Sequence, residues 1–345
     1  MIDSASLQAI QAGAMKFGSY LVYIVARMVI AFFSLVPRRP AARLIRILAD
    51  CAYFLDRRHR HIADVNLRIA FPDLTEAQRS RIARKSFQNT AMNLLEVSKL
   101  KSLTPSNIGS LVTYDPVNGV NNYRAALERG KGILYLTGHF SSWELLPVAH
   151  ALHGYPLSFI TRPLDNAPFE RYLLKVRESK GNRVINKKNS ARHILKELSS
   201  GSSAGILMDQ NTSTQEGMFI DLFGIPAATT TGVALFALRT DAPVLPGYLT
   251  PMRDGRYTIK FLPPMDVVRT GDMNHDLRVN TRRFNAILEE IIREQPESWL
   301  WGHKRWKYQP PENPQDLYAL SEQELESFLS RARSGVTPAQ NSEGG

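Results

Sequence analysis

Residues 133–144, ILYLTGHFSSWE, decide the fold class of this 345-residue chain. The apolar run 133–136 follows a Gly-Lys-Gly turn, as a short buried strand does. Polar residues come next, and a helical pattern begins at about residue 142. In an open α/β sheet, polar side chains directly after a strand lie where such folds bind ligands. We therefore expect a strand–loop–helix unit with a functional site in its loop.

The same alternation continues along the chain. We expect further helices at 121–129, 167–180, 189–199, 229–240 and 276–294, with a loop containing short extended pieces between 208 and 229. Strands are expected at 157–161, 182–186, 204–208, 243–249 and 256–262. This pattern predicts an α/β fold with a central, largely parallel or mixed sheet that is flanked by helices.

The N-terminal region contains a hydrophobic segment, residues 19–36, of about the minimum length for a bilayer-spanning helix. Arg27 near its middle costs about 3 kcal/mol, against roughly 0.3–0.6 kcal/mol gained by each large apolar residue. Spanning is therefore marginal, and the segment either spans the membrane or lies in it. Residues 41–55 repeat apolar residues at helical spacing and carry Arg43 and Arg46, which is typical of an amphipathic helix at a membrane surface. A helical hairpin of the globular domain is the alternative.

Three regions follow from these patterns. Residues 1–60 are expected to form membrane-anchoring, amphipathic helices, and residues 61–312 an α/β domain. Residues 313–345 are expected to be a polar, partly disordered tail. The basic cluster at 57–61 would keep its side of the hydrophobic segment in the cytoplasm.

The charge balance favours anionic partners. The chain has 43 Lys plus Arg against 32 Asp plus Glu, a net charge of +11. A membrane surface or an acidic carrier protein fits such a charge, whereas no motif supports nucleic-acid binding. Cys51 is the single cysteine, so no intramolecular disulfide forms, in keeping with a reducing compartment.

His139 and Glu144 are the candidate catalytic residues. A histidine can accept a proton from a hydroxyl near neutral pH, and we expect Glu144 to bind its other ring nitrogen. Positions i and i+5 are not neighbours on one helix, so His139 must precede the first turn, with Ser141 or Ser142 as the N-cap. An ordinary loop histidine followed by a first-turn glutamate is the alternative.

The segment GHFSSWE resembles the H-x-x-x-x-E motif of the glycerolipid and lysophospholipid acyltransferase superfamily. Over roughly residues 20–310 the chain is similar to the late acyltransferases of lipid A biosynthesis. The segments that carry this similarity are RHIADVNL at 60–67 with Phe71-Pro72, RPLDN at 162–166, DQN at 209–211, FGIPAATTTG at 223–232 and WLWGHKRWK at 299–307.

The resemblance implies a reaction without a cofactor. His139 would deprotonate an acceptor hydroxyl, which attacks an acyl thioester directly, in line with the absence of a G-x-S-x-G nucleophile motif. The donor would be acyl carrier protein or acyl-coenzyme A, and the acceptor an anionic lipid A precursor. Another glycolipid, such as a phosphatidylinositol mannoside, or a phospholipid is the alternative acceptor. The catalytic domain would lie on the cytoplasmic face of the inner membrane.

The resemblance also implies a set of substrate-binding residues, namely Arg162, Arg177, Asp209, Phe223 and Arg305. Arg162 follows a strand and suits a phosphate; Arg177 would bind the acceptor's charged head or lie on a solvated helix face. Asp209 would orient Arg162 or a substrate hydroxyl, with a structural role capping the next loop as the alternative. Phe223 would line an acyl channel.

Two weaker patterns complete the site predictions. Residues 228–232 would open a helix whose N–H groups favour an anion; the alternative is that their threonines are only caps. No metal site is expected, because His150 and His153 lack a third ligand and are expected to end a surface helix.

Overall fold

The computed structural model describes residues 4–117, 119–186 and 190–334. Its centre is a seven-stranded sheet in the order β1-β9-β8-β2-β5-β3-β4. The strands are β1 (Val112–Tyr114), β2 (Leu134–Thr137), β3 (Ser158–Thr161), β4 (Arg183–Asn186), β5 (Ala204–Leu207), β8 (Val244–Pro251) and β9 (Tyr257–Phe261). All neighbours pair in parallel except β8 and β9, so the predicted largely parallel, mixed sheet is confirmed.

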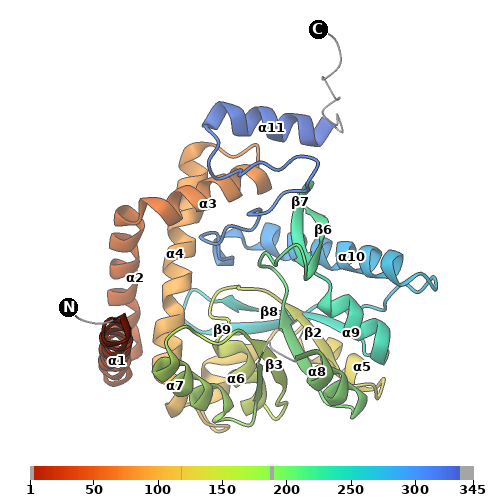
Figure 1. Cartoon of the computed structure of the whole chain (residues 1–345). Helices are drawn as coiled ribbons and strands as arrows, with labels where there is room; N and C mark the ends of the chain where they lie inside the picture. Colours follow the sequence, from red (N-terminus) through yellow and green to blue (C-terminus); the bar gives the residue numbers. More distant parts are fainter. Residues whose placement is uncertain (1–3, 118, 187–189, 335–345) are drawn as a thin grey trace.

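Helices cover both faces of this sheet (Figure 1). They are α5 (Val120–Leu127), α6 (Leu145–Leu152), α7 (Ala167–Glu178), α8 (Ser190–Ser199), α9 (Gly232–Thr240) and α10 (Met273–Glu294). Strand side chains alternate between the faces. Leu134 and Leu136 of β2 therefore pack in one core with α8, α9 and α10, whereas Tyr135 packs in another with α5, α6 and α7.

The N-terminal quarter is helical, as expected. It contains α1 (Ser4–Leu35), α2 (Arg38–Leu55), α3 (Arg57–Ala70) and α4 (Glu76–Lys99). Thr75 and Gln78 form a capping box at the start of α4, which satisfies two otherwise unpaired helix-end groups. Within α1, residues Gly18–Leu35 have a mean hydropathy of 1.7, and they are long and apolar enough to cross a membrane. Short 3₁₀ turns lie at Leu100–Ser102, Ile108–Ser110 and Pro296–Ser298.

Two segments differ from the sequence-based expectation. The loop expected between 208 and 229 contains the antiparallel hairpin of β6 (Gly217–Leu222) and β7 (Ile225–Thr230). Within the expected polar tail, α11 (Glu322–Ser334) is a helix that buries Leu325, Phe328 and Leu329 in the main core. Its three apolar residues at spacings of three and one were too few to stand out among charged neighbours. The rest of the expected tail, residues 335–345, lies outside the described residues.

Candidate active site

The loop between β2 and α6 positions His139. A Cβ on Gly138 would come within 3.0 Å of Asp209 side-chain atoms and within 2.8 Å of Phe140, so only glycine lets the strand end lie this close to Asp209. Ser141 has a φ of 49°, in the left-handed region, which turns the chain sharply after the histidine. Its carbonyl accepts a 2.8 Å hydrogen bond from Asn93 of α4, which holds the turn in place.

His139 is paired with Asp209, which follows β5. Its Nδ1 lies 2.8 Å from Asp209 Oδ1, and its backbone N–H donates to Oδ2 at the same distance. The indole N–H of Trp299 also donates to Oδ2 at 2.8 Å. The carboxyl is buried, which by itself raises its pKa, but the charge and hydrogen bonds of His139, with the Trp299 bond, lower it to about 2. Asp209 is therefore ionised and accepts a hydrogen bond from the Nδ1–H of His139.

This pairing determines which ring nitrogen can act as a base. With the proton held on Nδ1, the Nε2 lone pair is available on the cavity side. The side-chain amide of Gln210 lies 3.3 Å from Nε2, and the ring of Trp143 contacts the imidazole edge-on with centroids 5.1 Å apart. The imidazole is therefore oriented by one carboxylate and one aromatic ring, with an amide beside its reactive nitrogen.

The predicted contact between His139 and Glu144 is wrong. Glu144 instead pairs with Arg177 of α7, whose Nε and terminal nitrogen donate to the two carboxylate oxygens at 3.0 and 2.5 Å. The helix expected from residue 142 begins at Leu145, so Glu144 occupies the N-cap position, and it lines the same cavity as His139 without contacting it. Burial lowers the pKa of Arg177, but the hydrogen bonds and charge of Glu144 raise it overall, so the pair stays charged.

Asp209 also differs from its predicted partners. It was expected to orient Arg162 or a substrate hydroxyl, and it instead binds His139. Parallel strands bring their carboxyl ends to one edge, and β2 and β5 are neighbours in register from Leu134↔Ala204 to Thr137↔Leu207. Residues that follow these two strands therefore meet across the sheet edge.

A cavity of about 1240 Å³ adjoins His139. Buried residues of the strands and α6 line its interior, among them Tyr135, Phe159, Gly205, Gly247 and Phe261. Exposed or half-buried basic residues line its rim, namely Arg58, Arg162, Lys304 and Lys307. Such a cavity suits a molecule with a long apolar part and an anionic part.

Arg162 and Arg177 both line this cavity, in different states. Arg162 lies one residue after β3, at the carboxyl edge as predicted, and is exposed. Within the described ranges it forms no ion pair, so its guanidinium is available to a ligand. Arg177 is buried and already bound to Glu144.

Phe223 and Arg305 are not among the residues that line the cavity. Phe223 sits in the β6–β7 turn with a φ of 53° and packs against Phe71 and under Arg293. Arg305 is fully buried and donates to the carbonyl of Ala228 and the hydroxyl of Thr229. Neither side chain therefore lines this cavity, and the acyl-channel role of Phe223 and the substrate contact of Arg305 stay predictions.

The helix start predicted within 228–232 is confirmed only at its end, where Thr231 is the N-cap of α9, and the anion site stays a prediction. Residues 228–230 belong to β7, and α9 begins only at Gly232. The guanidinium of Arg305 binds Ala228 and Thr229 of this segment, and burial lowers its pKa to about 10. The run of three threonines has high strand propensity, which outweighed the helical pattern that follows it.

His150 does not end a surface helix. It is buried, with Nδ1 2.7 Å from the hydroxyl of Tyr114 and Nε2 2.8 Å from that of Tyr135. Burial lowers its pKa to about 3, so it is a neutral link between two tyrosines. Among the described residues, no group of three or more His, Cys, Asp or Glu side chains is placed to hold a metal ion.

The sequence-based site lacked Trp299, Gln210 and His303. His303 accepts a hydrogen bond from the backbone N–H of Asn211 at 3.3 Å, and burial lowers its pKa to about 4. Asn66 binds the carbonyls of Trp301 and His303 at 2.7 Å each, which ties α3 to this segment. The Trp-rich stretch at 299–307 was noted as part of the family resemblance. Nothing in its spacing indicated that Trp299 contacts Asp209.

Comparison with known proteins gives one consistent result. The family model for the bacterial lipid A biosynthesis acyltransferase matches residues 13–308. The lipid A biosynthesis lauroyltransferase of Escherichia coli (strain K12) is 26% identical over 259 residues, which are 74% of this chain and 81% of the relative. The palmitoleoyltransferase of the same organism is 26% identical over 267 residues, covering 77% and 84%. Its myristoyltransferase is 24% identical over 298 residues, covering 84% and 90%.

Proposed function

The chain belongs to the bacterial lipid A biosynthesis acyltransferase family, and from this premise we propose its donor, its base and its mechanism. As a member of this family it is an acyltransferase. The reaction we propose moves a fatty acyl chain from an acyl carrier protein thioester to a hydroxyl of a lipid A precursor. The enzyme acts at the cytoplasmic face of the inner membrane.

The pairing of His139 with buried, ionised Asp209 carries this proposal. Nε2 removes the proton from the acceptor hydroxyl as its oxygen attacks the thioester carbonyl. A C–O bond forms, the C–S bond breaks, and the proton passes from the imidazolium to the departing thiolate. Asp209 stabilises the imidazolium, and the base contributes about 10²- to 10⁴-fold to the rate.

The two parts of the cavity suit the two substrates. The buried interior accommodates the acyl chain, and its volume of about 1240 Å³ exceeds that of typical small-molecule pockets. The basic rim of Arg58, Arg162, Lys304 and Lys307 complements a phosphorylated acceptor or an acidic carrier protein. The amide of Gln210, beside Nε2, is placed to hold the acceptor oxygen or the thioester oxyanion.

A serine hydrolase is disfavoured by the same geometry. The Ser142 hydroxyl is buried and bonds to Tyr257 at 3.1 Å, and Ser141 is also buried. The described contacts of the His139 ring are with Asp209, Gln210 and Trp143. The base is therefore directed at a substrate hydroxyl, and no serine nucleophile stands beside it.

The test is a substrate matrix with purified protein in detergent. Acyl carrier protein and coenzyme A thioesters are each offered with a lipid A precursor or a lysophospholipid, and products are identified by mass spectrometry. We expect transfer from the carrier protein to the lipid A precursor. In Arg162→Ala, KM for that acceptor should rise about tenfold, because one exposed charge-assisted contact is lost. Arg192→Ala on α8 is the matched control. Preferential acylation of the lysophospholipid, or from the coenzyme A thioester, would contradict the proposed substrates.

A further inference from the structure

The tripeptide Asp209-Gln210-Asn211, which closely follows β5, contacts two histidine rings. Asp209 binds Nδ1 of His139 at 2.8 Å, and the amide of Gln210 lies 3.3 Å from Nε2 of the same ring. The backbone N–H of Asn211 donates to Nε2 of His303 at 3.3 Å. Three consecutive residues therefore bring both imidazoles to one edge of the sheet, and both rings line the large cavity.

The protein partner of each ring determines where its proton lies. An ionised carboxylate can only accept a hydrogen bond, so Asp209 keeps a proton on Nδ1 of His139. A backbone N–H can only donate, so Nε2 of His303 carries the lone pair. Burial lowers the pKa of His303 to about 4, and the positive charges of Arg305 and Lys307 act in the same direction. The ring of His303 is therefore neutral near pH 7, and its one proton is on Nδ1.

Nδ1 of His303 is an unused hydrogen-bond donor. It has no hydrogen-bond partner within the described ranges. The buried side-chain atoms without a partner in this part of the chain belong to Thr281, Asn285 and Arg305, so Nδ1 of His303 is not enclosed by protein. Because His303 lines the large cavity, its Nδ1–H is available to a molecule that enters there.

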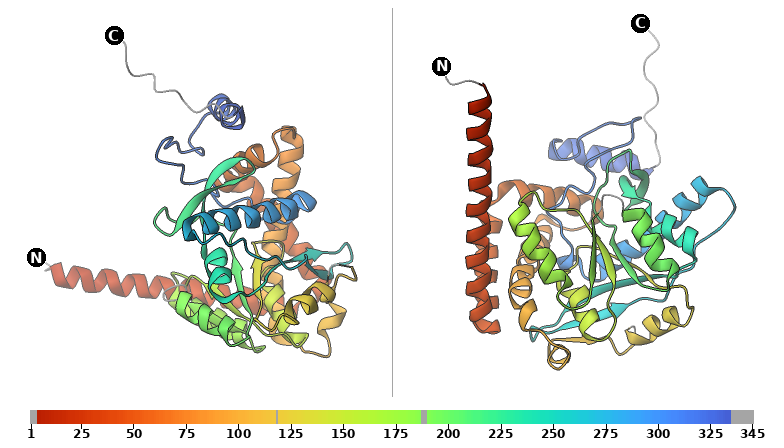
Figure 2. Two further views of the ribbon diagram at one scale, coloured as in Figure 1. Left: turned by 90° about the vertical axis from the view of Figure 1, so that its right-hand side faces the viewer. Right: turned by 60° about the horizontal axis from the view of Figure 1, so that its bottom comes forward.

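The segment that carries His303 is fixed on both sides. Asn66 of α3 donates to the carbonyl of His303 at 2.7 Å. Arg305, two residues further along, donates to Ala228 and Thr229 of β7. Figure 2 shows this segment, which follows α10, between the N-terminal helices and the hairpin of β6 and β7. The donor is therefore preorganised, as a group that stabilises developing charge must be.

The same segment is also bonded to the loop of His139. The backbone N–H of Leu300 donates to the carbonyl of His139 at 3.2 Å, and that of Ser141 donates to the carbonyl of Ser298 at 2.7 Å. These backbone bonds join the two segments directly. The position of the His303 ring relative to the base is therefore set by main-chain contacts as well as by Asn211.

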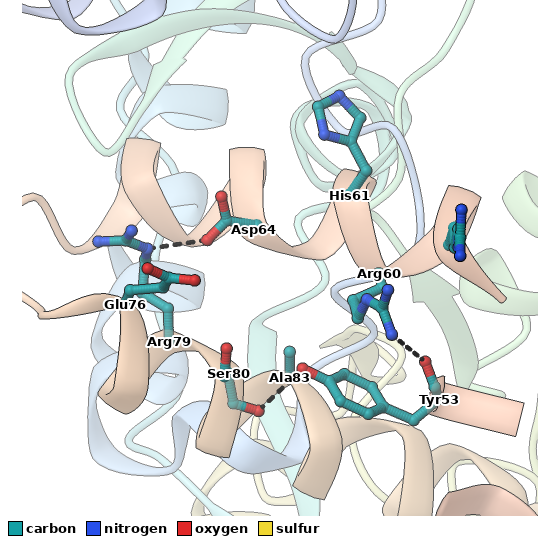
Figure 3. A pocket seen from close by; sticks show the side chains of 9 residues that line it. Tyr53, Arg60, His61, Asp64, Glu76, Arg79, Ser80 and Ala83 are labelled. Atoms are coloured by element: carbon teal, nitrogen blue, oxygen red, sulfur yellow. Dashed lines mark hydrogen bonds and ion pairs between the residues drawn. The ribbon is translucent and has the colours of Figure 1, made fainter. Parts of the chain in front are cut away.

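Polar groups in the smaller cavity of the molecule are already bound to protein. This cavity, of about 270 Å³, lies between α2, α3 and α4 (Figure 3). In it Arg60 donates to the carbonyl of Tyr53 at 3.2 Å, and Arg79 donates to Asp64 at 2.9 Å. The Nδ1–H of His303 differs from these donors, because no described protein group accepts a hydrogen bond from it.

A neutral donor beside a base suits one step of acyl transfer. When a hydroxyl oxygen attacks a thioester, the π electrons of the carbonyl move onto its oxygen. That oxygen remains an oxyanion until the C–S bond breaks. A preorganised hydrogen-bond donor stabilises this charge, and a neutral imidazole can serve in this role. Because the neutral ring is a very weak acid, it keeps its proton throughout the step.

We propose that His303 is an oxyanion donor, whose Nδ1–H binds the thioester carbonyl oxygen while His139 deprotonates the acceptor hydroxyl. This role rests on the acyl transfer proposed above. His303 contacts the reacting group in the tetrahedral intermediate, near the amide of Gln210, and transfers no proton. The two histidines have opposite functions because the protein binds opposite ring atoms, Nδ1 of His139 and Nε2 of His303.

Two substitutions separate the donor from the contact with Asn211. In His303→Asn, the amide nitrogen takes the place of Nδ1 and remains a donor, but the contact with Asn211 is lost. In His303→Gln, the amide oxygen takes the place of Nε2 and accepts from Asn211, but the donor at Nδ1 is lost. We expect kcat to fall about 10²- to 10³-fold in His303→Gln and about tenfold or less in His303→Asn. KM for the acceptor should stay near the wild-type value in both variants.

A purely structural role would give the opposite order, because only His303→Asn releases Asn211. A larger loss of kcat in His303→Asn, or equal losses in the two variants, would overturn the proposal. A rise in KM for the acceptor at unchanged kcat would show that His303 binds the acceptor instead, and would overturn it as well. His153→Gln is the matched control and should keep the wild-type kcat, because His153 is partly buried but lies outside the cavity and contacts the carbonyl of Val112.

The assay uses the thioester and the acceptor that the wild-type protein prefers, since an oxyanion forms whichever hydroxyl attacks. Inactivity of the wild type with every pair would overturn the proposed function together with this role. A wild-type kcat in His303→Gln would overturn the donor alone.

The position of the proton is measured without substrate, by heteronuclear NMR of protein labelled at histidine. The spectrum of His303→Gln assigns the signals of His303. We expect the neutral Nδ1–H tautomer between pH 7 and pH 5, above the pKa of about 4. A proton on Nε2, or a charged ring at pH 7, would leave no neutral Nδ1–H donor and would overturn the proposal.

Discussion

The two ends of the loop between β2 and α6 belong to different networks. At one end, His139 pairs with a buried aspartate and keeps Nε2 toward the cavity. At the other, Glu144 pairs with a guanidinium that cannot lose its proton near neutral pH. An imidazole–carboxylate pair can exchange a proton with a substrate, whereas a guanidinium–carboxylate pair remains charged and fixes geometry. Under the proposed mechanism, one short motif therefore has the base at one end and a structural ion pair at the other.

Removing the base should have the largest effect. His139→Ala should lower kcat about 10²- to 10⁴-fold, because the acceptor hydroxyl loses its proton acceptor. The variant should also be less stable, because the buried Asp209 carboxylate loses its main partner, so the comparison is made at a temperature at which both proteins are folded. Single-turnover transfer with purified protein measures the loss. A variant that keeps most of the wild-type kcat would refute His139 as the base.

The partner of the base comes next. Asp209→Asn should lower kcat about 100-fold, because an amide no longer fixes the proton on Nδ1 or stabilises an imidazolium. Acceptor KM should stay near the wild-type value, which separates this role from substrate binding. The same assay applied to Glu144→Gln sharpens the comparison. If Glu144→Gln loses more kcat than Asp209→Asn while remaining folded, Glu144 rather than Asp209 assists the base.

Substitutions of Glu144 should mainly lower the free energy of unfolding. Glu144→Gln leaves the buried Arg177 guanidinium without its counter-charge, and the free energy of unfolding should fall by about 3 kcal/mol. The double variant Glu144→Leu with Arg177→Leu should recover much of that loss, as apolar replacements of buried pairs do. Urea unfolding followed by circular dichroism measures both. Purely additive losses would show that the two side chains do not stabilise each other.

The smallest effect is a pH dependence specific to Asp209. The folded-state pKa of about 2 lies below the ordinary value of 3.8, so the ionised carboxylate stabilises the fold above pH 4. This contribution, about 2 kcal/mol, is lost as the pH falls from about 4 to about 2. The stability difference between wild type and Asp209→Asn should therefore shrink between pH 5 and pH 2 in urea titrations. A difference that stays constant over this range would contradict an ionised Asp209.

The mixed sheet followed directly from local patterns. Strand-like segments of four to seven residues between helical stretches predicted six of the seven strands, because each segment is too short for a typical helix. β1 was missed because it has only three residues. Short extended pieces were expected where β6 and β7 lie, but their pairing into a hairpin was not, because their apolar residues mix with polar ones. α11 was missed because charged side chains surround its few buried residues.

The site was predicted in part. His139 and Arg162 lie where a strand's carboxyl edge places them, because that placement depends only on where each strand ends. Phe223 and Arg305 carried expectations from similarity, and the structure packs both away from the cavity. The partner of His139 was predicted from a spacing of five residues, whereas the actual partner lies seventy residues further along the chain.

The sequence alone determined the α/β alternation, the histidine after a strand, and an apolar N-terminal segment with one central arginine. These are local properties of side-chain size and spacing. The tertiary structure alone decided that Asp209 meets His139, because β2 and β5 become neighbours only when the chain crosses over between them. It likewise decided that Arg27 stacks on Tyr172, so that the helix docks on the body with its apolar face outward. Contacts between distant residues depend on strand order and helix packing, which no local pattern contains.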